Sequence, residues 1–259
     1  MTNPATVLSG RRHPGVFALG CLAVTVGAAL HLPMFWMGRD DGFRLAGMPM
    51  DSGMEWGMFL IVVGIAVAAY GLLPRRGPSA DALETVHVIL PDDAPLSWSH
   101  WRLLLVLTVA LVIDVMKTST LGFVIPGVMN EYHISNATAA WLPFSSLCGT
   151  VGSVLWGWFA DLFGRRASIL LAAVMFIGTS ICGAMPTFGF NLLMCFLMGT
   201  AVGGMLPVAF ALLAETMPTR HRGWALVLVG GLGAVGGYLA TSWVSSWLQP
   251  ILLACHVAH

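Results

Sequence analysis

The chain has 259 residues, of which 9% are charged and 57% hydrophobic, and its mean hydropathy is +0.83. Because soluble domains carry roughly 25% charged residues, this composition excludes a water-exposed globular surface. The formal net charge of zero sums over two sides of a membrane, and nothing in it suggests nucleic-acid binding. We therefore expect a membrane protein whose first partner is the lipid bilayer.

Seven stretches are long and apolar enough to cross a bilayer, which takes about 20 residues. In chain order they are residues 15–37, 54–73, 101–125, 139–160, 167–186, 190–214 and 224–248. No water satisfies the backbone inside the hydrocarbon core, so each stretch must be helical. A barrel of short alternating strands does not match such long apolar runs. The predicted fold class is all-α, a polytopic membrane protein with about seven transmembrane helices.

The first stretch follows Arg11 and Arg12, an arrangement that also begins secretory signal peptides. It is longer than a typical signal and lacks a small-x-small cleavage site after it, so we expect an uncleaved anchor. A polar segment rich in Pro, Ser and acidic residues follows the second stretch. The predicted regions are a two-helix transmembrane hairpin (residues 1–74), a cytoplasmic linker (75–100) and a five-helix region (101–259).

Basic residues concentrate on one side of these spans. If the N-terminus is cytoplasmic, the outer segments hold only Arg39 and Arg44. The inner segments then hold Arg11, Arg12, Arg75, Arg76, Arg102, Arg165, Arg166, Arg220 and Arg222. Cytoplasmic loops carry the excess of Lys and Arg in membrane proteins. We predict a multi-pass protein of the plasma (inner) membrane with its N-terminus in the cytoplasm and its C-terminus outside.

The loop between the fourth and fifth stretches carries a spaced motif, formed by Gly157, Asp161, Gly164, Arg165 and Arg166. It resembles Gly-x-x-x-Asp-x-x-Gly-Arg-Arg, which the major facilitator superfamily places between its second and third helices. The sequence departs from that pattern at position 162, where leucine stands in place of the usual basic residue. The resemblance assigns the third predicted stretch as the first helix of the family.

A second motif follows the sixth stretch and comprises Glu215, Pro218, Arg222 and Gly223. This Glu-x-x-Pro-x-x-x-Arg-Gly spacing resembles the sugar-porter and organic-acid-porter branches of the same superfamily. The two motifs occur in the family's order and at the expected ends of their spans. Residues 101–248 are thus similar to the N-terminal part of such a transporter.

The resemblance implies a fold of two six-helix halves around a midplane site. The sequence offers five of those spans after the hairpin, so we expect an incomplete N-terminal bundle of a truncated permease. The resemblance also implies that the two motifs form a cytoplasmic gate. In that gate, Gly157 and Gly164 permit close helix approach, Asp161 pairs with the neighbouring arginines, and Glu215 pairs with Arg222. A plain positive-inside anchor is the alternative for the arginines.

Asp114 and Lys117 lie in the middle of the third stretch, three residues apart and so on one helix face. A charge at bilayer depth costs roughly 2.5–3.5 kcal/mol and usually faces a cavity or a partner. The family's first helix lines the substrate path, which makes Lys117 the candidate receptor of an anionic substrate and Asp114 the candidate carrier of a coupling proton. Ser119 and Thr120 are candidate hydrogen-bond donors nearby. The alternative is a self-neutralised structural pair.

Cysteine, methionine and histidine show no regular metal-ligand spacing. The five cysteines are scattered, and four lie within apolar stretches, where we expect them to act as small buried hydrophobes. One of them, Cys195, stands where the family's fourth helix commonly has an arginine. Thioether groups are ligands for Cu(I), and methionines gather near His31, but without regular spacing, so we interpret them as apolar packing at the membrane interface. We predict no metal, no cofactor and no enzymatic activity.

The expected function is transport of a small organic solute, an organic acid or a sugar, driven by protons. The expected partners are that solute, protons, and either the missing C-terminal half or a separate partner chain. The alternative is a non-transporting binding or regulatory protein, or a half-transporter subunit.

Overall fold

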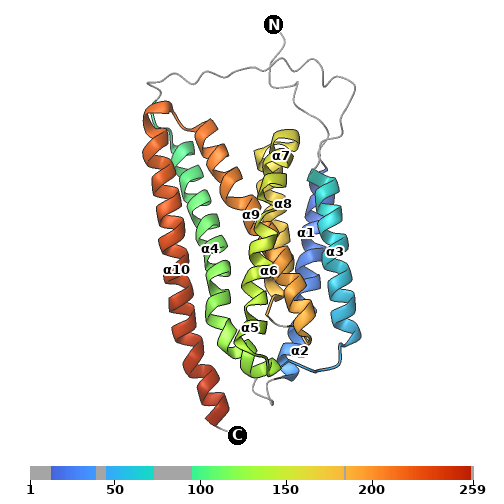
Figure 1. Cartoon of the computed structure of the whole chain (residues 1–259). Coiled ribbons are helices and arrows are strands. Elements are labelled where there is room, and N and C mark those ends of the chain that lie inside the picture. The colour runs from blue at the N-terminus through green and yellow to red at the C-terminus, as the bar shows by residue number, and fades with distance from the viewer. Residues whose placement is uncertain (1–12, 39–44, 73–94, 184, 258–259) are drawn as a thin grey trace.

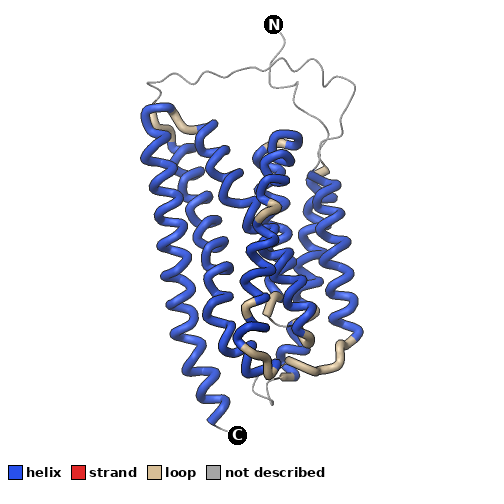
Figure 2. Tube along the Cα trace, in the orientation of Figure 1, coloured by secondary structure: helices blue, strands red, loops and turns tan. Residues whose placement is uncertain are grey.

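The computed structural model describes residues 13–38, 45–72, 95–183 and 185–257, with side chains except at positions 153 and 248–257. The described residues form helices joined by short loops and contain no strand (Figure 2). Six helical stretches among them are long and apolar enough to span a membrane. The predicted all-α polytopic membrane fold is therefore confirmed.

The N-terminal hairpin consists of α1 (Pro14–Ala29), α2 (Leu32–Met37) and α3 (Ser52–Leu72). The first predicted span is interrupted between α1 and α2, because Pro33 has no N–H to donate to the carbonyl of Ala29. α1 and α3 pack closely through small residues, as in many membrane helix pairs. A Cβ atom built on Gly27 would lie only 2.6 Å from the carbonyl oxygen of Gly57.

The remaining helices form a bundle beside this hairpin (Figure 1). They are α4 (Trp98–Tyr132), α5 (Asn136–Ala139), α6 (Trp141–Thr150), α7 (Ser153–Phe163), α8 (Arg165–Gly178), the short 3-10 helix η3 (Thr179–Ile181), α9 (Phe188–Thr216) and α10 (Thr219–Val257). The fourth predicted span is thus divided into α5, α6 and α7. The third and seventh are longer than expected.

The fifth predicted span, residues 167–186, differs most from expectation. Its α-helical part, α8, has 14 residues, which at 1.5 Å per residue covers about 21 Å of a hydrocarbon core about 30 Å thick. The chain then continues as η3 and a loop to α9. α8 consequently ends inside the bundle, and its last carbonyl groups lie among other helices.

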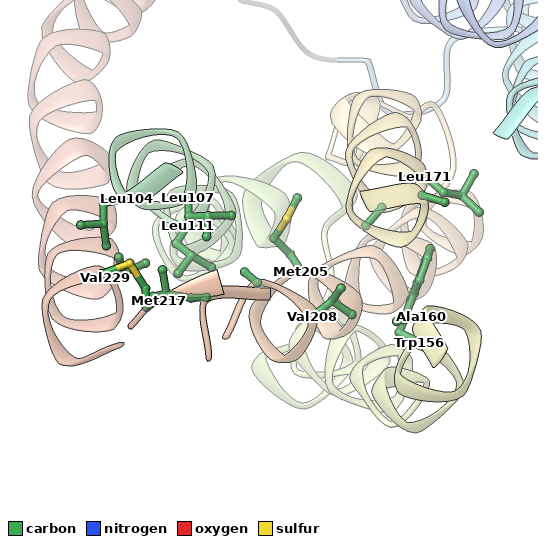
Figure 3. Close-up of a cluster of buried hydrophobic side chains, with 14 of the residues drawn as sticks. Leu104, Leu107, Leu111, Trp156, Ala160, Leu171, Met205, Val208, Met217 and Val229 are labelled. Atoms are coloured by element: carbon green, nitrogen blue, oxygen red, sulfur yellow. The ribbon is translucent and has the colours of Figure 1, made fainter. Parts of the chain in front are cut away.

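α9 is the central helix of the bundle. Half of the residues in an 18-residue apolar stretch of α9 are buried, whereas a third or fewer are buried in the corresponding stretches of the other candidate spans. A Cβ atom on Gly199 of α9 would clash with the carbonyl of Ser146, and one on Gly149 of α6 would clash with the carbonyl of Phe196. Leucines of α4 and residues of α9 and α10, among them Met205 and Val229, fill the core between these helices (Figure 3).

The hairpin is attached to the bundle at both its helices and at the loop before α3. Val24 of α1 and Ala68 of α3 are buried against Val174 of α8. The backbone N–H groups of Leu45 and Ala46 donate to Oε1 of Glu131 at 2.6 and 2.9 Å. These contacts fix the loop before α3 to the end of α4.

Part of the predicted topology lies outside the described residues. Of the 75–100 linker the structure describes residues 95–100, and α4 already begins at Trp98. Arg11, Arg12, Arg39, Arg44, Arg75 and Arg76 also lie outside. The α7–α8 and α9–α10 junctions lie at the same end of the bundle as the start of α4, and α10 ends at the opposite end (Figure 1).

The α6–α9 contact predicts how two glycines will respond to the same substitution. Gly199→Ala should destabilise the protein by about 1–3 kcal/mol, the usual cost of overpacking, because its new Cβ atom would meet the backbone of Ser146. Gly231→Ala on α10 has open space and should be neutral or stabilising by up to ~1 kcal/mol. Thermal unfolding of the full chain in detergent measures both. Equal effects would show that the α6–α9 contact is not tight.

Candidate functional site

A cavity of about 300 Å³ lies between α4, the end of α8 and α9. Its polar lining consists of Lys117, Thr120, Ser180 and Cys182, and its apolar lining includes Met116, Leu121, Val124, Phe176 and Met198. A smaller cavity of about 170 Å³, between α3, α8 and α9, is lined almost entirely by apolar side chains. The first cavity therefore combines a cation, hydroxyl groups and an apolar wall, and is the candidate binding site.

The interrupted end of α8 holds the ammonium group of Lys117. Its Nζ donates to the carbonyl oxygen of Phe176 and to Oγ1 of Thr179, both at 2.7 Å. It also lies 4.1 Å from the centre of the Phe176 ring, within cation–π range. The last carbonyls of a helix lack intrahelical partners and carry partial negative charge. Within the described part of the chain these contacts use two of the three N–H donors, which leaves one for a ligand.

Asp114 is almost fully buried, with 3% of its surface exposed, and its Oδ1 atom has no hydrogen-bond partner among the described residues. It continues the buried face of α4 that carries Leu107 and Leu111. Among the residues described, no ion pair joins it to Lys117. Although Asp114 and Lys117 are only three residues apart, the ammonium group of Lys117 binds the end of α8 instead of the Asp114 carboxyl group.

The two hydroxyl candidates on α4 differ in position. Ser119 lies 2.8 Å from the hydroxyl of Thr241, so it joins α4 to α10, and it is not part of the cavity lining. Thr120 lines the cavity, but its hydroxyl donates to the carbonyl of Met116 at 2.7 Å. Its oxygen remains available as an acceptor.

Arg165 connects the two sequence motifs. Its NH1 atom lies 2.8 Å from Asp161, in the same motif, and its Nε atom lies 3.0 Å from Glu215, at the end of α9. The expected pairing of Asp161 with an arginine is therefore present. Glu215, however, pairs with Arg165, and no ion pair to Arg222 occurs in the described part of the chain. A single guanidinium group thus joins α7, α8 and α9 at one end of the bundle.

The glycines of the first motif have different roles. Gly164 adopts φ +93°, a conformation that non-glycine residues rarely take, and this sharp turn separates α7 from α8. Gly157 has no heavy atom within 4 Å of a built Cβ, and neither has Gly164. The close helix approach expected at these two positions is absent, because the tight contacts of the bundle lie deeper, at Gly149 and Gly199.

The second motif makes the turn from α9 to α10. Pro218 is fully buried, and the residue before it, Met217, is extended with ψ 139°, as the proline ring requires. α9 therefore ends and α10 can begin at Thr219. The Nε atom of Arg222 is buried without a hydrogen-bond partner in the described structure, and Gly223 has open space around its Cα atom.

Sequence reasoning missed the partners of Lys117 on α8 and η3. Thr179 and Ser180 are adjacent polar residues within an otherwise apolar predicted span, and that interruption was the available signal. A polar link nearby was also missed. Asn191 of α9 is buried, accepts from the N–H of Gly183 at 2.9 Å and donates to the hydroxyl of Tyr132 at 2.7 Å. The loop before α9 is thereby attached to α4.

Metal ligands do not gather around either motif. Among the described residues, no group of three or more His, Cys, Asp or Glu side chains is placed to hold a metal ion. The methionines near His31 instead fill a buried cluster that includes Met34, Met54 and Met194.

Comparison with known proteins agrees with the two motifs. The family model of the Major Facilitator Superfamily matches residues 107–252. The chain belongs to the Major Facilitator Superfamily. The resemblance inferred from the motifs is therefore confirmed, and the match begins within α4, after the hairpin.

Similar proteins include both transporters and a vesicle protein. The niacin transporter NiaP of Acinetobacter baylyi is 27% identical over 61% of this chain and 36% of its own length. The benzoate transport protein of the same organism is 28% identical over 62% of this chain and 36% of its own length. Synaptic vesicle glycoprotein 2C of Rattus norvegicus is 31% identical over 55% of this chain and 20% of its own length. The chain spans about a third of the length of each of the two transporters. No solved structure matches it. NiaP and the benzoate transport protein are transporters and not enzymes.

The two glycines of the first motif should respond oppositely to alanine. Gly164→Ala forces a side chain into a positive-φ conformation and should destabilise the protein by roughly 1–3 kcal/mol. Gly157→Ala, in the open interior of α7, should be neutral or stabilising by up to ~1 kcal/mol. Thermal unfolding in detergent distinguishes them. A Gly157 variant as unstable as the Gly164 variant would indicate a close approach that this structure does not contain.

Proposed function

We propose that this chain takes part in the transport of a small organic anion, which binds Lys117 in the cavity between α4, α8 and α9. The observation that carries the proposal is the remaining N–H donor of Lys117 beside that cavity. A charged group at this depth is costly, and the carbonyl and hydroxyl at the end of α8 hold it in place. A carboxylate in the cavity would complete its coordination.

The proposed substrate class is an aromatic or similarly compact carboxylic acid. Relatives of the chain are named for niacin, benzoate, gallate and 4-hydroxybenzoate. The cavity lining supports that class, because it places one cation beside an aromatic ring, a few hydroxyls and an apolar wall. A sugar would require more hydrogen-bonding groups than the lining provides.

The proposed gate is the cluster at the α7–α8 and α9–α10 junctions. Exposed ion pairs are each worth about 0–1 kcal/mol, and both carboxylates that pair with Arg165 are more than half exposed. Such pairs bias one conformation without fixing the fold, which suits a gate. The basic residues at this end, Arg165, Arg166, Arg220 and Arg222, support a cytoplasmic assignment, with the C-terminus outside and the plasma membrane as location.

Alternating access in this family uses two bundles around a shared site, and the described helices make one bundle. We propose that the second bundle is contributed by further sequence or by a partner chain, with residues 1–74 as an added hairpin and residues 101–259 as the family domain. A half-transporter subunit is the second candidate. Co-purification with a separate multi-span partner would favour it.

Asp114 is the proposed proton carrier. The carboxyl group is buried and its Oδ1 atom has no hydrogen-bond partner in the described structure, so a negative charge on it would be poorly stabilised. A bound proton neutralises the group and removes the free-energy cost of burying that charge. Its position on α4, one turn from Lys117, links proton occupancy to the same helix that binds the anion. Proton coupling would then act through α4.

The first test of this function is Lys117→Met, measured as binding of radiolabelled nicotinate and benzoate to the full chain in detergent. A hydrogen bond to a charged group contributes about 1.5–3 kcal/mol, so binding should weaken roughly 10- to 150-fold. Lys117→Arg should retain part of the affinity, because it keeps the charge.

Thr108→Val provides the matched control for this test. Thr108 lies on α4 and donates to its own helix at the carbonyl of Leu104, so its loss should leave binding unchanged. If Lys117→Met binds both anions as tightly as the unmodified chain, the cavity is not the anion site.

Asp114→Asn should uncouple proton movement from anion binding. The amide mimics the protonated carboxyl but cannot release or take up a proton. A pH-indicator dye in weakly buffered detergent solution should report proton uptake or release when nicotinate is added to the unmodified chain, and none with the variant. An unchanged proton signal in Asp114→Asn would assign the coupling to another group.

A further inference from the structure

Two cysteines on separate elements bring their thiols together beside the Lys117 cavity. The Sγ atoms of Cys182, directly after η3, and Cys195, in α9, lie 2.8 Å apart, and both residues are free thiols. In a disulfide the sulfurs are about 2.05 Å apart, so a bond requires only a small side-chain movement. From the sequence alone, both are expected to be small buried hydrophobes.

The two thiols differ in accessibility. Cys182 is partly exposed and lines the cavity that also contains Lys117. Cys195 is buried, with 1% of its surface exposed. A small oxidant that enters the cavity therefore meets Cys182 first, and Cys195 lies behind it in the position of a resolving thiol.

The segment that carries Cys182 also holds Lys117. Thr179, which accepts from the ammonium group, begins η3, and Cys182 follows the end of that helix. The next residue, Gly183, donates its N–H to Asn191 of α9 at 2.9 Å. In the reduced protein, hydrogen bonds of this kind attach the segment to α9. A covalent bond between Cys182 and Cys195 would replace a reversible contact by a fixed one.

We propose that Cys182 and Cys195 form a redox-active pair that a peroxide converts to a disulfide, which fixes the segment after α8 to α9 at the wall of the Lys117 cavity. The sulfur of Cys182 attacks one peroxide oxygen, the O–O bond breaks, and a sulfenic acid and one water form. The thiol of Cys195 then attacks that sulfur, the S–O bond breaks, and a second water leaves with the thiol proton. Two thiols are oxidised by two electrons and one peroxide is reduced to two waters.

The test begins with the purified full chain in detergent, treated with hydrogen peroxide and then blocked with N-ethylmaleimide. After reduction, newly exposed thiols are labelled with a maleimide-polymer, and the bridged peptide is identified by mass spectrometry. The expected result is two protected thiols, located at Cys182 and Cys195. Cys148→Ser should give the same result, because Cys148 lies on α6 outside this pair, whereas Cys195→Ser should give none.

Two results would contradict the proposal that Cys182 and Cys195 form a disulfide. One is that both thiols remain open to N-ethylmaleimide after peroxide treatment of the unmodified chain. The other is equal protection in Cys195→Ser, which would indicate bridging to a different cysteine. The bridged peptide is sought in the unmodified chain, so a serine variant that fails to fold does not decide the outcome.

The effect on the cavity has its own measurement. Lys117 is the sole lysine of the sequence, so an amine-reactive ester reports on it directly, apart from the N-terminus, which mass spectrometry separates. Oxidation should slow its modification several-fold, and Cys195→Ser should abolish the difference. An unchanged rate in the bridged protein would show that the disulfide does not restrict access to Lys117.

The consequence for anion binding rests on the proposed function, and the two can fail separately. Peroxide should weaken nicotinate binding in the unmodified chain but not in Cys195→Ser. If Lys117→Met leaves binding intact, the proposed anion site fails while the thiol and lysine measurements still test the disulfide. If the thiols do not bridge, the redox proposal fails and the anion site is unaffected.

Discussion

Close contact between α9 and the helices around it sets the spacing of the whole bundle. At Gly199 and Gly149 the absence of a side chain lets backbone meet backbone, and in lipid such packing replaces the hydrophobic driving force of soluble cores. At the residue after Gly199, the carbonyl of Thr200 accepts from the indole N–H of Trp156 at 2.7 Å. With α6 and α7 held against one side of α9, α8 and α4 occupy the others, and the end of α8 comes within reach of Lys117.

The short length of α8 provides partners for the buried ammonium group of Lys117. Had α8 crossed the full hydrocarbon thickness, its last carbonyls would lie near the membrane surface. Because it ends at Gly178, those carbonyls lie inside the bundle, where they hold the ammonium group of the only lysine in the sequence. The same interruption opens the cavity beside Lys117 and places Cys182 next to Cys195. The cavity with its ammonium group and the thiol pair therefore depend on one break in helical structure.

The two motifs illustrate how separate local patterns combine. Each motif was recognisable from the spacing of its residues. The turn at Gly164 and the end of α9 before Pro218 follow from the backbone conformations that glycine allows and proline imposes. Which carboxylates share Arg165 was not recognisable, because Glu215 is fifty residues away in sequence and reaches it only through the packing of α8 on α9. The expected pairing of Glu215 with Arg222 was reasonable by proximity in the chain, and packing gave Glu215 a different partner.

The sequence by itself determined the membrane class, the helical fold, the order of the spans and the family, because these follow from local composition and spacing. Apolar length requires helices in a solvent without hydrogen bonds, and both motifs are continuous in the chain. The tertiary structure decided the separation of Asp114 from Lys117, the position of Ser119 against α10, the end of α8 inside the bundle and the meeting of the two thiols. Each of these depends on how one helix is rotated and shifted against another. That geometry is set by side-chain packing between segments far apart in the chain, which a linear pattern does not encode.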